Sequence, residues 1–144
     1  MKPAAKPNNG AGKWGVAALA GFQPLPDVLL LKQKELGLDA VDIIVLLNVT
    51  HYWWFRDRPP YLRTNLIAER MDVTGRTIQR VIKKLQEKGY IRREKWTDEK
   101  GETYPAIFFD GLIRKLEVLA CADPRLEQRI QKAQAKNDEQ MEGF

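Results

Sequence analysis

The segment from residue 56 to residue 96 holds half of the cationic side chains of this 144-residue chain, twelve of twenty-four. It carries only five Asp and Glu residues, so its local charge is +7, larger than the net charge of +5 of the whole chain. Residues 1–13 add +3, whereas residues 14–55 and 97–144 contribute −2 and −3. A basic middle third between flanks of lower charge indicates an anionic partner for that segment.

Residues 51–61, HYWWFRDRPPY, add five aromatic rings interleaved with arginines. Such a run has two interpretations, a platform on which bases stack or the apolar end of a helix that enters a loop. On a helix, neighbouring residues point about 100° apart, so the four consecutive rings at 52–55 cannot form one platform. We therefore expect packing for this run, with stacking as the alternative, and we expect His51 at the edge of the core.

The side-chain inventory argues against catalysis. The chain has no serine, one histidine and one cysteine, which excludes a Ser-His-Asp triad and metal sites built on several histidines. The carboxylate pair Asp98 and Glu99 falls in a predicted exposed turn, where a raised pKa is not expected. We therefore expect no enzymatic activity, no metal and no cofactor.

The overall composition, with 44% apolar and 30% charged residues, is typical of a soluble globular protein. The length suits one domain with tails, and the Pro-, Gly- and Lys-rich start predicts a flexible basic tail over residues 1–21. Cys121 is the only cysteine, which favours a reducing compartment. No apolar run approaches the roughly 20 residues of a membrane span. We therefore expect a cytoplasmic protein.

Two helices are predicted before the basic segment. The stretch PDVLLLKQKELG (26–37) predicts a short helix that Gly37 ends. Asp39 is placed to cap the next helix, with Asp42 in its first turn. This second helix is apolar almost all round, which predicts burial on several sides. It cannot pass Arg58, because a residue that precedes proline disfavours the helical conformation.

Two more helices and a hairpin are predicted within the basic segment. Thr64 is expected to cap a helix over 65–71, and Thr74 is expected to cap the helix that follows. In this later helix four apolar residues recur at i, i+3, i+4 and i+7, and they are Ile78, Val81, Ile82 and Leu85. Gly89 is expected to end it. Two strand-like runs, YIRREKW and ETYPAIFF, follow on either side of the turn-forming TDEKG.

Helix, short turn, helix and charged hairpin together resemble the winged helix-turn-helix fold of DNA-binding regulators over residues 39–109. The small Ala68 and the apolar residues Val73, Ile78 and Val81 match that signature, and LQEKGYIRRE resembles the run that leads into the wing of MarR-type regulators. Asp72 stands where this family usually has glycine. Since Asp tolerates the left-handed conformation better than most residues, the turn is expected to form.

The wider pattern, from FQPLPDVLL to RTIQRVIKKLQEKGYI, is also similar to helix-turn-helix domains of bacterial, plasmid and phage proteins, including N-terminal domains of replication initiators. The implied fold class is mainly α with a small β-hairpin, a winged helix-turn-helix with extra N- and C-terminal helices. The implied DNA-binding domain covers residues 22–109, and residues 110–144 form C-terminal helices.

The chemistry of the basic segment agrees with this resemblance, because a helix fits the major groove and its outer side chains reach base edges. Arg76, Gln79 and Arg80 have forked donors suited to base edges, whereas the lysines and the remaining arginines suit phosphates. The predicted helix N-termini add backbone N–H groups for phosphate. The candidate DNA-binding residues are Arg63, Thr64, Asn65, Thr74, Gly75, Arg76, Thr77, Gln79, Arg80, Lys83, Lys84, Arg93, Lys95 and Lys100.

The C-terminal helices are predicted from their caps. Asp110 is expected to cap a helix over 111–122 that carries a stripe of Leu112, Leu116 and Leu119, and Asp123 with Pro124 starts another helix. The spacing of apolar residues in the last helix resembles a coiled-coil seam, but two heptads leave core packing and dimerisation both open. We expect a homodimer, with the leucine-striped helix 111–121 as its interface.

Three functions are consistent with these patterns. The first is a sequence-specific double-stranded DNA-binding protein, a transcriptional regulator that reads the major groove with helix 75–88 and phosphates with the wing 91–109. The second is a plasmid or phage replication-initiation or partition factor. The third is a winged-helix adaptor that binds another protein, and retention on DNA at moderate salt separates it from the other two.

Overall fold

The computed structural model describes residues 12–143. It is mainly helical with one antiparallel hairpin, which confirms the predicted class, a winged helix-turn-helix with extra helices at both ends. Part of the predicted flexible tail, residues 1–11, lies outside the described residues. The elements in chain order are η1 (Gly15–Ala20), α1 (Asp27–Leu31), α2 (Gln33–Leu36), α3 (Ala40–Thr50), α4 (Thr64–Met71), α5 (Gly75–Glu87), β1 (Arg92–Thr97), β2 (Thr103–Phe108), α6 (Asp110–Ala122) and α7 (Pro124–Glu142).

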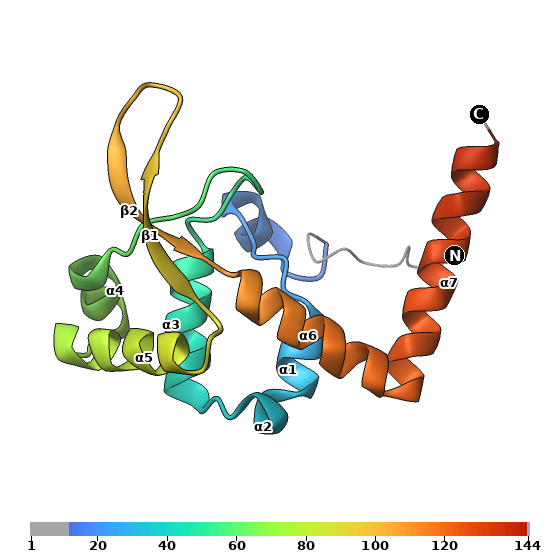
Figure 1. Cartoon of the computed structure of the whole chain (residues 1–144), viewed down its shortest axis with the longest axis horizontal. Helices are drawn as coiled ribbons and strands as arrows, with labels where there is room; N and C mark the ends of the chain where they lie inside the picture. Colours follow the sequence, from blue (N-terminus) through green and yellow to red (C-terminus); the bar gives the residue numbers. More distant parts are fainter. Residues whose placement is uncertain (1–11, 144) are drawn as a thin grey trace.

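Helices α3, α4 and α5 cluster at one end of the molecule, and the hairpin projects from them (Figure 1). Helix α6 runs from the base of the hairpin away from this cluster, beside α1, and α7 follows at its far end (Figure 1). The core lies between α3, α5, α6 and the base of the hairpin, and it includes Leu46, Ile67, Ile78, Ile82, Leu85, Ile107 and Leu112. All four apolar residues of the predicted α5 stripe are buried, as expected.

The single helix predicted over 26–37 is two short helices, α1 and α2. The break lies at Lys32, whose φ of −115° and ψ of 26° leave the helical region, and whose Nζ lies 2.9 Å from Asp123 Oδ2. Gly37 ends α2 as predicted, in the left-handed conformation at φ 69°. The amides of Gly37 and Leu38 donate back to the carbonyls of Lys34 and Gln33, the pairing of a Schellman cap.

Helix α3 begins as predicted and ends earlier than expected. Asp39 and Asp42 form a reciprocal capping box, with side-chain to backbone distances of 2.8 and 2.9 Å. After Thr50 the bonds tighten to i→i−3, from the Tyr52 amide to Val49 and from the Trp53 amide to Thr50. The prediction that the aromatic run forms the last turns of this helix is therefore wrong, and the run lies in the connection to α4.

The helix-turn-helix between α4 and α5 forms as predicted apart from one cap. Asp72 adopts the left-handed conformation at φ 55° and ψ 48°, and Val73 N donates to Ala68 O, which closes the turn. Thr74 caps α5 and accepts from the Thr77 amide at 3.3 Å. Thr64, however, is the first residue of α4 and does not cap it, because the preceding Arg63 holds the cap position.

The hairpin pairs Arg92 with Phe108 at its base and Thr97 with Thr103 near its tip, close to the predicted strands. The connection before α4 is bonded to the edge of the hairpin formed by β2. Ile107 N donates to Pro60 O at 2.7 Å, and Tyr61 forms a bridge with Ala106. Residues 60–61 therefore lie alongside β2, joined to it by this bond and by an isolated bridge. The hairpin is held to the connection as well as to the core.

Helix α6 packs closely against the end of α5. A Cβ atom at Gly111 would lie 1.7 Å from the Gly89 carbonyl oxygen, so only glycine permits this approach. Asp110 is the first residue of α6 and makes no capping bond, so that predicted cap is wrong. The leucine stripe on α6 packs against the chain's own core, and the use of helix 111–121 as a dimer interface stays a prediction.

Helix α7 is capped by Asp123 and starts with Pro124, as predicted. Leu126 is buried and Ile130 is half-buried, but every described residue of α7 after Ile130 is exposed. None of the helices in the described part of the chain is both long and apolar enough to cross a membrane. Across residues 12–143 no group of three or more His, Cys, Asp or Glu side chains is arranged to hold a metal ion.

Candidate nucleic-acid interface

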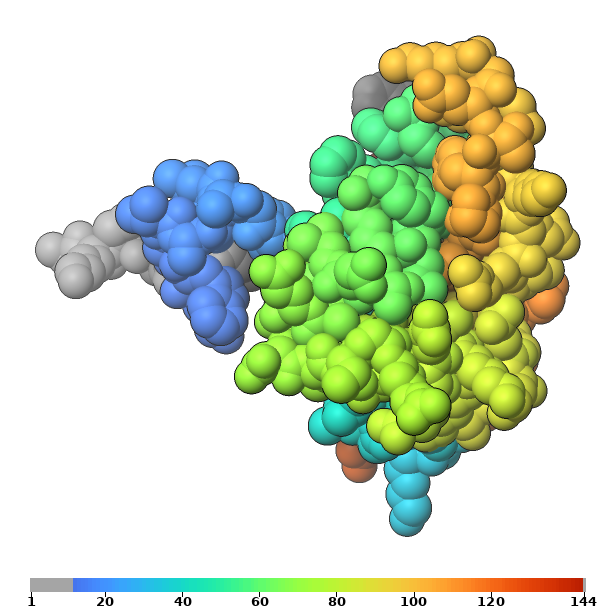
Figure 2. Space-filling view, turned by 90° about the vertical axis from the view of Figure 1, so that its left-hand side faces the viewer, coloured from blue at the N-terminus to red at the C-terminus, as the bar shows by residue number. Residues whose placement is uncertain are grey.

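The outer face of α5 is built by the helical repeat. Its apolar side chains at 78, 81, 82 and 85 are buried, and this fixes the opposite side toward solvent. Arg76, Gln79, Arg80 and Lys83 are all exposed there. Helices α4 and α5 share one surface of the molecule with the hairpin (Figure 2). The outer face of α5 and the hairpin are therefore presented on the same side.

The two arginines of this face are free to meet a ligand. Among the described residues, no ion pair involves Arg76 or Arg80. Lys83 has only a loose pair with Glu87, at 4.0 Å between exposed groups, which a phosphate would readily replace. The structure thus brings the predicted base-reading residues Arg76, Gln79 and Arg80 together on one free face.

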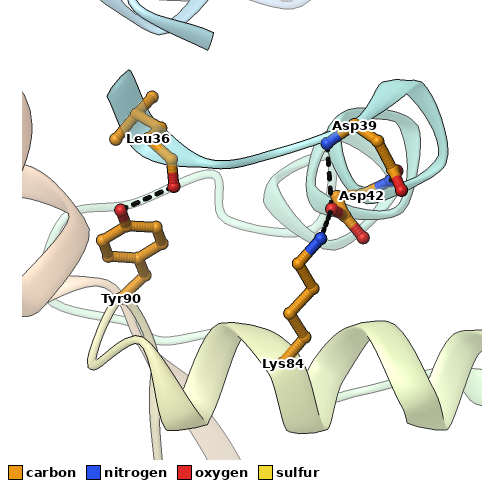
Figure 3. A network of polar contacts seen from close by, with 5 residues as sticks. All are labelled: Leu36, Asp39, Asp42, Lys84 and Tyr90. Carbon is orange, nitrogen blue, oxygen red and sulfur yellow. Dashed lines mark hydrogen bonds and ion pairs between the residues drawn. The ribbon is translucent and has the colours of Figure 1, made fainter. Parts of the chain in front are cut away.

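Lys84 is placed differently from the other candidates. Its Nζ lies 2.5 Å from Asp42 Oδ2, and Asp42 is almost wholly buried (Figure 3). The hydrogen bond to Asp42 raises the pKa of Lys84, so this ammonium stays charged and ties α5 to the capping box of α3. Its expected contact with a phosphate stays a prediction, and such a contact would have to compete with Asp42.

A second bond lies just beyond the same end of α5. Tyr90, just after the helix, donates its hydroxyl hydrogen to the Leu36 carbonyl at 2.8 Å (Figure 3). Burial raises the pKa of this phenol, which keeps the donor protonated. Both contacts lie at the C-terminal end of α5, where they tie the helix to the segment that carries α2 and α3.

The N-termini of α4 and α5 converge, as the helix-turn-helix requires. A Cβ atom placed on Gly75 would lie 3.6 Å from Thr64 Cγ2 and 3.9 Å from Asn65 Oδ1. Thr74 and Thr77 hydroxyls lie 3.2 Å apart at the same point. The predicted residues at these two N-termini therefore lie together, and helix N-termini carry free N–H groups and partial positive charge. Their contact with a phosphate stays a prediction.

On the hairpin, Arg93 and Lys95 are exposed on β1, where they stand opposite Ile107 and Pro105. Lys100 lies in the turn at the tip, where its backbone amide donates to Asp98 Oδ1 at 2.9 Å. The neighbouring Arg92 is occupied, because it pairs with both Glu94 and Asp110. The three predicted wing residues therefore lie along the hairpin rather than at one point.

Arg63 is placed in an environment that sequence reasoning missed. Its guanidinium carbon lies 4.3 Å from the centre of the Tyr61 ring and 4.8 Å from that of Tyr52, so it is held between two aromatic rings. Its Nε is buried, with no hydrogen-bond partner among the described residues. Arg63 belongs to this aromatic cluster more than to the α5 face.

This cluster opens into a groove of about 360 Å³ between the connection and the hairpin tip, which we call the aromatic groove. Tyr104 of β2 lines the groove and donates its hydroxyl hydrogen to Pro59 O at 2.9 Å. The run HYWWFRDRPPY was the signal for this groove, although packing was expected. The groove is lined by Tyr52, Trp54, Arg58, Pro59, Pro60, Tyr61, Arg63, Asp98, Glu99, Lys100, Glu102 and Tyr104.

The aromatic run divides between the two predicted interpretations. Trp53 stacks on Phe109 with ring centres 4.9 Å apart, so packing is right for this residue. Trp54 and Phe55 are 74% and 56% exposed, so packing is wrong for these two. His51 is half-buried beside Gln23, whose Nε2 lies 2.7 Å from its Nδ1, at the edge of the core as expected.

Comparison with known proteins agrees with this architecture. The sequence model of the family described as "DnaD N-terminal domain" matches residues 25–123. The chain is similar to the solved N-terminal domain of DnaD protein from Geobacillus kaustophilus HTA426, with TM-score 0.54 and 21% identity over 88% of this chain and 97% of that one. This likeness supports the fold.

A solved structure titled as a possible transcriptional regulator from Methanosarcina mazei Go1 is similar at TM-score 0.38 and 19% identity, over 82% of this chain and 86% of that one. That score is too low to inform the fold. No curated protein sequence matches the chain significantly.

Proposed function

The chain belongs to the DnaD N-terminal domain family, and on that premise we propose that it is a sequence-specific double-stranded DNA-binding protein. The observation that carries the proposal is the two-sided α5, with its apolar side buried and Arg76, Gln79 and Arg80 free on the other. Forked donors on a helix that stands clear of the body are suited to base edges in a major groove.

The neighbouring groups support the same docking geometry. With α5 in the groove, the joined N-termini of α4 and α5 face one phosphate backbone through Thr64, Asn65 and Thr74. Arg93 and Lys95 on β1 then meet the backbone beside the wing. Lys84 contributes by holding α5 to α3 through Asp42, and Arg63 contributes through the aromatic groove.

A role in DNA replication is the form of this function that we favour. Membership of the DnaD N-terminal domain family and the similarity to N-terminal domains of replication initiators both support it over transcriptional regulation. The match of LQEKGYIRRE to MarR-type regulators keeps regulation as the second candidate. Mapping the bound sites along the genome separates the two, because an initiator would occupy repeats at an origin and a regulator would occupy promoters.

We also propose that the protein binds DNA as a homodimer. One recognition helix reads only a few base pairs, and a two-fold dimer doubles the site. Since the leucine stripe of α6 packs internally, the interface has to use other exposed apolar side chains, such as Val118 of α6. Light scattering of the free and the DNA-bound protein tests this, and a monomer in both states would refute it.

The central test is duplex binding as a function of salt. With about 4–8 phosphates neutralised, log K is expected to fall against log salt with a slope of roughly −4 to −7. The double substitution Arg76→Ala with Arg80→Ala should remove sequence preference. Arg125→Ala on α7, an exposed arginine outside this surface, is the matched control and should change nothing. A slope near zero would favour the protein adaptor.

A further inference from the structure

The aromatic groove has features that duplex binding by α5 does not use. It lies between the connection 51–63 and the hairpin tip, so it combines segments about forty residues apart in the chain, as Tyr61 and Tyr104 illustrate with ring centres 5.8 Å apart. Its aromatic side chains are carried by backbone that is hydrogen-bonded to β2 through Pro60 and Ile107. Exposed clusters of aromatic side chains often mark a binding site.

We propose that the aromatic groove binds unpaired nucleobases of single-stranded DNA, with Trp54 as the principal stacking surface. Trp54 is 74% exposed, and its indole N–H donates to the His51 carbonyl at 2.6 Å. This bond fixes the edge of the indole and leaves its faces open. Every base has a flat π face, so a fixed open indole is suited to stacking without a particular base sequence.

The other rings of the groove are already in contact with arginine side chains. The guanidinium of Arg63 lies against both Tyr52 and Tyr61, so that face of each ring is occupied. Arg58 likewise lies 5.5 Å from the centre of the Phe55 ring. No cation lies over Trp54 among the described residues. The groove therefore leaves the indole of Trp54 open to a planar ligand.

The charges of the groove lie on two sides and orient the strand. Arg58 and Arg63 belong to the connection, whereas the hairpin tip contributes three carboxylates, Asp98, Glu99 and Glu102, against one ammonium, that of Lys100. The Asp98 carboxylate accepts from two backbone amides of the tip, those of Lys100 and Glu102. A strand would thus place its phosphates along Arg58 and Arg63, away from the carboxylates, and its bases toward Trp54. Phosphates on that side continue toward the N-terminus of α4, which begins at Thr64.

Two substitutions of exposed tryptophans test the proposal directly. The probe is a labelled oligothymidylate of about 16 nucleotides, which has no secondary structure of its own to compete. Trp54→Ala is expected to weaken its binding to the full chain about tenfold, the loss of roughly one stacked base. Trp14→Ala is the matched control, because Trp14 is 69% exposed and outside the groove, and it should bind like the wild type.

Two further variants distinguish stacking on Trp54 from a general loss of affinity. Trp54→Phe keeps an aromatic face and should retain most of the affinity. Glu99→Gln with Glu102→Gln should strengthen binding, because it removes the repulsion between the hairpin tip and the phosphates. Thermal unfolding is expected to be unchanged in all of these variants, since the three substituted groove side chains project from surface segments.

Equal binding by Trp54→Ala and Trp14→Ala would overturn the proposal, as would a wild-type chain that does not bind oligothymidylate. If the double glutamine variant bound more weakly, the orientation of the strand would be refuted and a cationic partner would replace DNA as the occupant. The duplex proposal fails separately. If Trp54→Ala lost oligothymidylate binding while Arg80→Ala left duplex binding unchanged, the proposal for the aromatic groove would stand. The proposal that α5 reads duplex DNA would fail.

Discussion

Helix α5 and the connection 51–63 both carry arginines and apolar side chains, but what orients these side chains differs between the two regions. In α5, a regular repeat separates buried residues such as Ile78 from exposed residues such as Arg80. In the connection, adjacent residues diverge, so Trp53 packs on Phe109 whereas Trp54 stands open. A helix presents a surface defined by its own geometry, and a connection presents one defined by whatever it packs against.

This difference has a consequence for function. The outer face of α5 is a regular row of donors on a fixed axis, which suits a regular partner such as the duplex. The connection presents isolated rings and arginine planes at irregular angles, which suit unstacked bases one at a time. The two regions meet at the start of α4. Arg63 lines the aromatic groove there, and the next residue, Thr64, lies close to Gly75 at the N-terminus of α5.

The largest effect is expected from the buried side of α5. Ile78 has no exposed surface, so Ile78→Ala should lower the free energy of unfolding by about 2–5 kcal/mol. Arg76→Ala, two residues earlier on the exposed side, should change it by less than about 0.5 kcal/mol. Urea unfolding measures both. Equal effects of the two substitutions would show that the helix does not separate its faces in this way.

The tryptophan pair makes the same distinction within the connection. Trp53→Ala should cost about 2–4 kcal/mol of stability, somewhat below the range for a fully buried ring, because Trp53 is half-buried against Phe109. Trp54→Ala should cost less than about 0.5 kcal/mol. Thermal or urea unfolding of the two variants decides, and a larger cost at Trp54 would reverse our assignment of the two rings.

A smaller effect, on binding only, is expected at Arg80. Arg80→Ala should weaken binding to the preferred duplex by about 1–3 kcal/mol and relax base preference at one position. Its stability should be that of the wild type, because the side chain is exposed and unpaired among the described residues. Affinities on matched specific and random duplexes are the measurement. Unchanged affinity on both duplexes would mean that α5 does not read DNA.

The wing should contribute less to DNA affinity than Arg80, and its contribution should be the same on every DNA sequence. Lys95→Ala removes one exposed charge on β1 and should lower the magnitude of the salt slope by about one on every duplex. Lys132→Ala on α7, equally exposed and distant from the wing in sequence, is the control and should leave the slope unchanged. A base-dependent loss at Lys95 would instead place the wing in a groove.

The smallest expected effect concerns the cap that positions α5 through α3. The hydrogen bond from the Asp42 amide lowers the pKa of Asp39 in the folded protein. Asp39 therefore stabilises the fold above its unfolded pKa of about 3.9, and this contribution is lost as pH falls through the lower folded value. Asp39→Asn should be less stable than the wild type at neutral pH, and the difference should vanish in acid. A constant difference across pH would contradict this.

Local sequence patterns determined most of the structure of α5, of the turn before it and of the helix caps. The α5 repeat, the Thr74 cap, the left-handed turn at Asp72 and the cap at Asp39 each depend on residues within one or two turns of one another. Interactions of this kind are set by helix geometry and by the donors that helix ends leave free. The winged helix-turn-helix class and the free face of α5 could therefore be predicted from the sequence.

Only the tertiary structure decided how side chains outside that pattern are used. Lys84 pairs with Asp42, 42 residues earlier, and is thereby withdrawn from the exposed face where the helical repeat alone put it. The leucines of α6 face the core because Gly111 lets that helix approach Gly89. Trp54 stays open because α3 ends at Thr50. Each outcome depends on contacts between distant residues, and no local period encodes them.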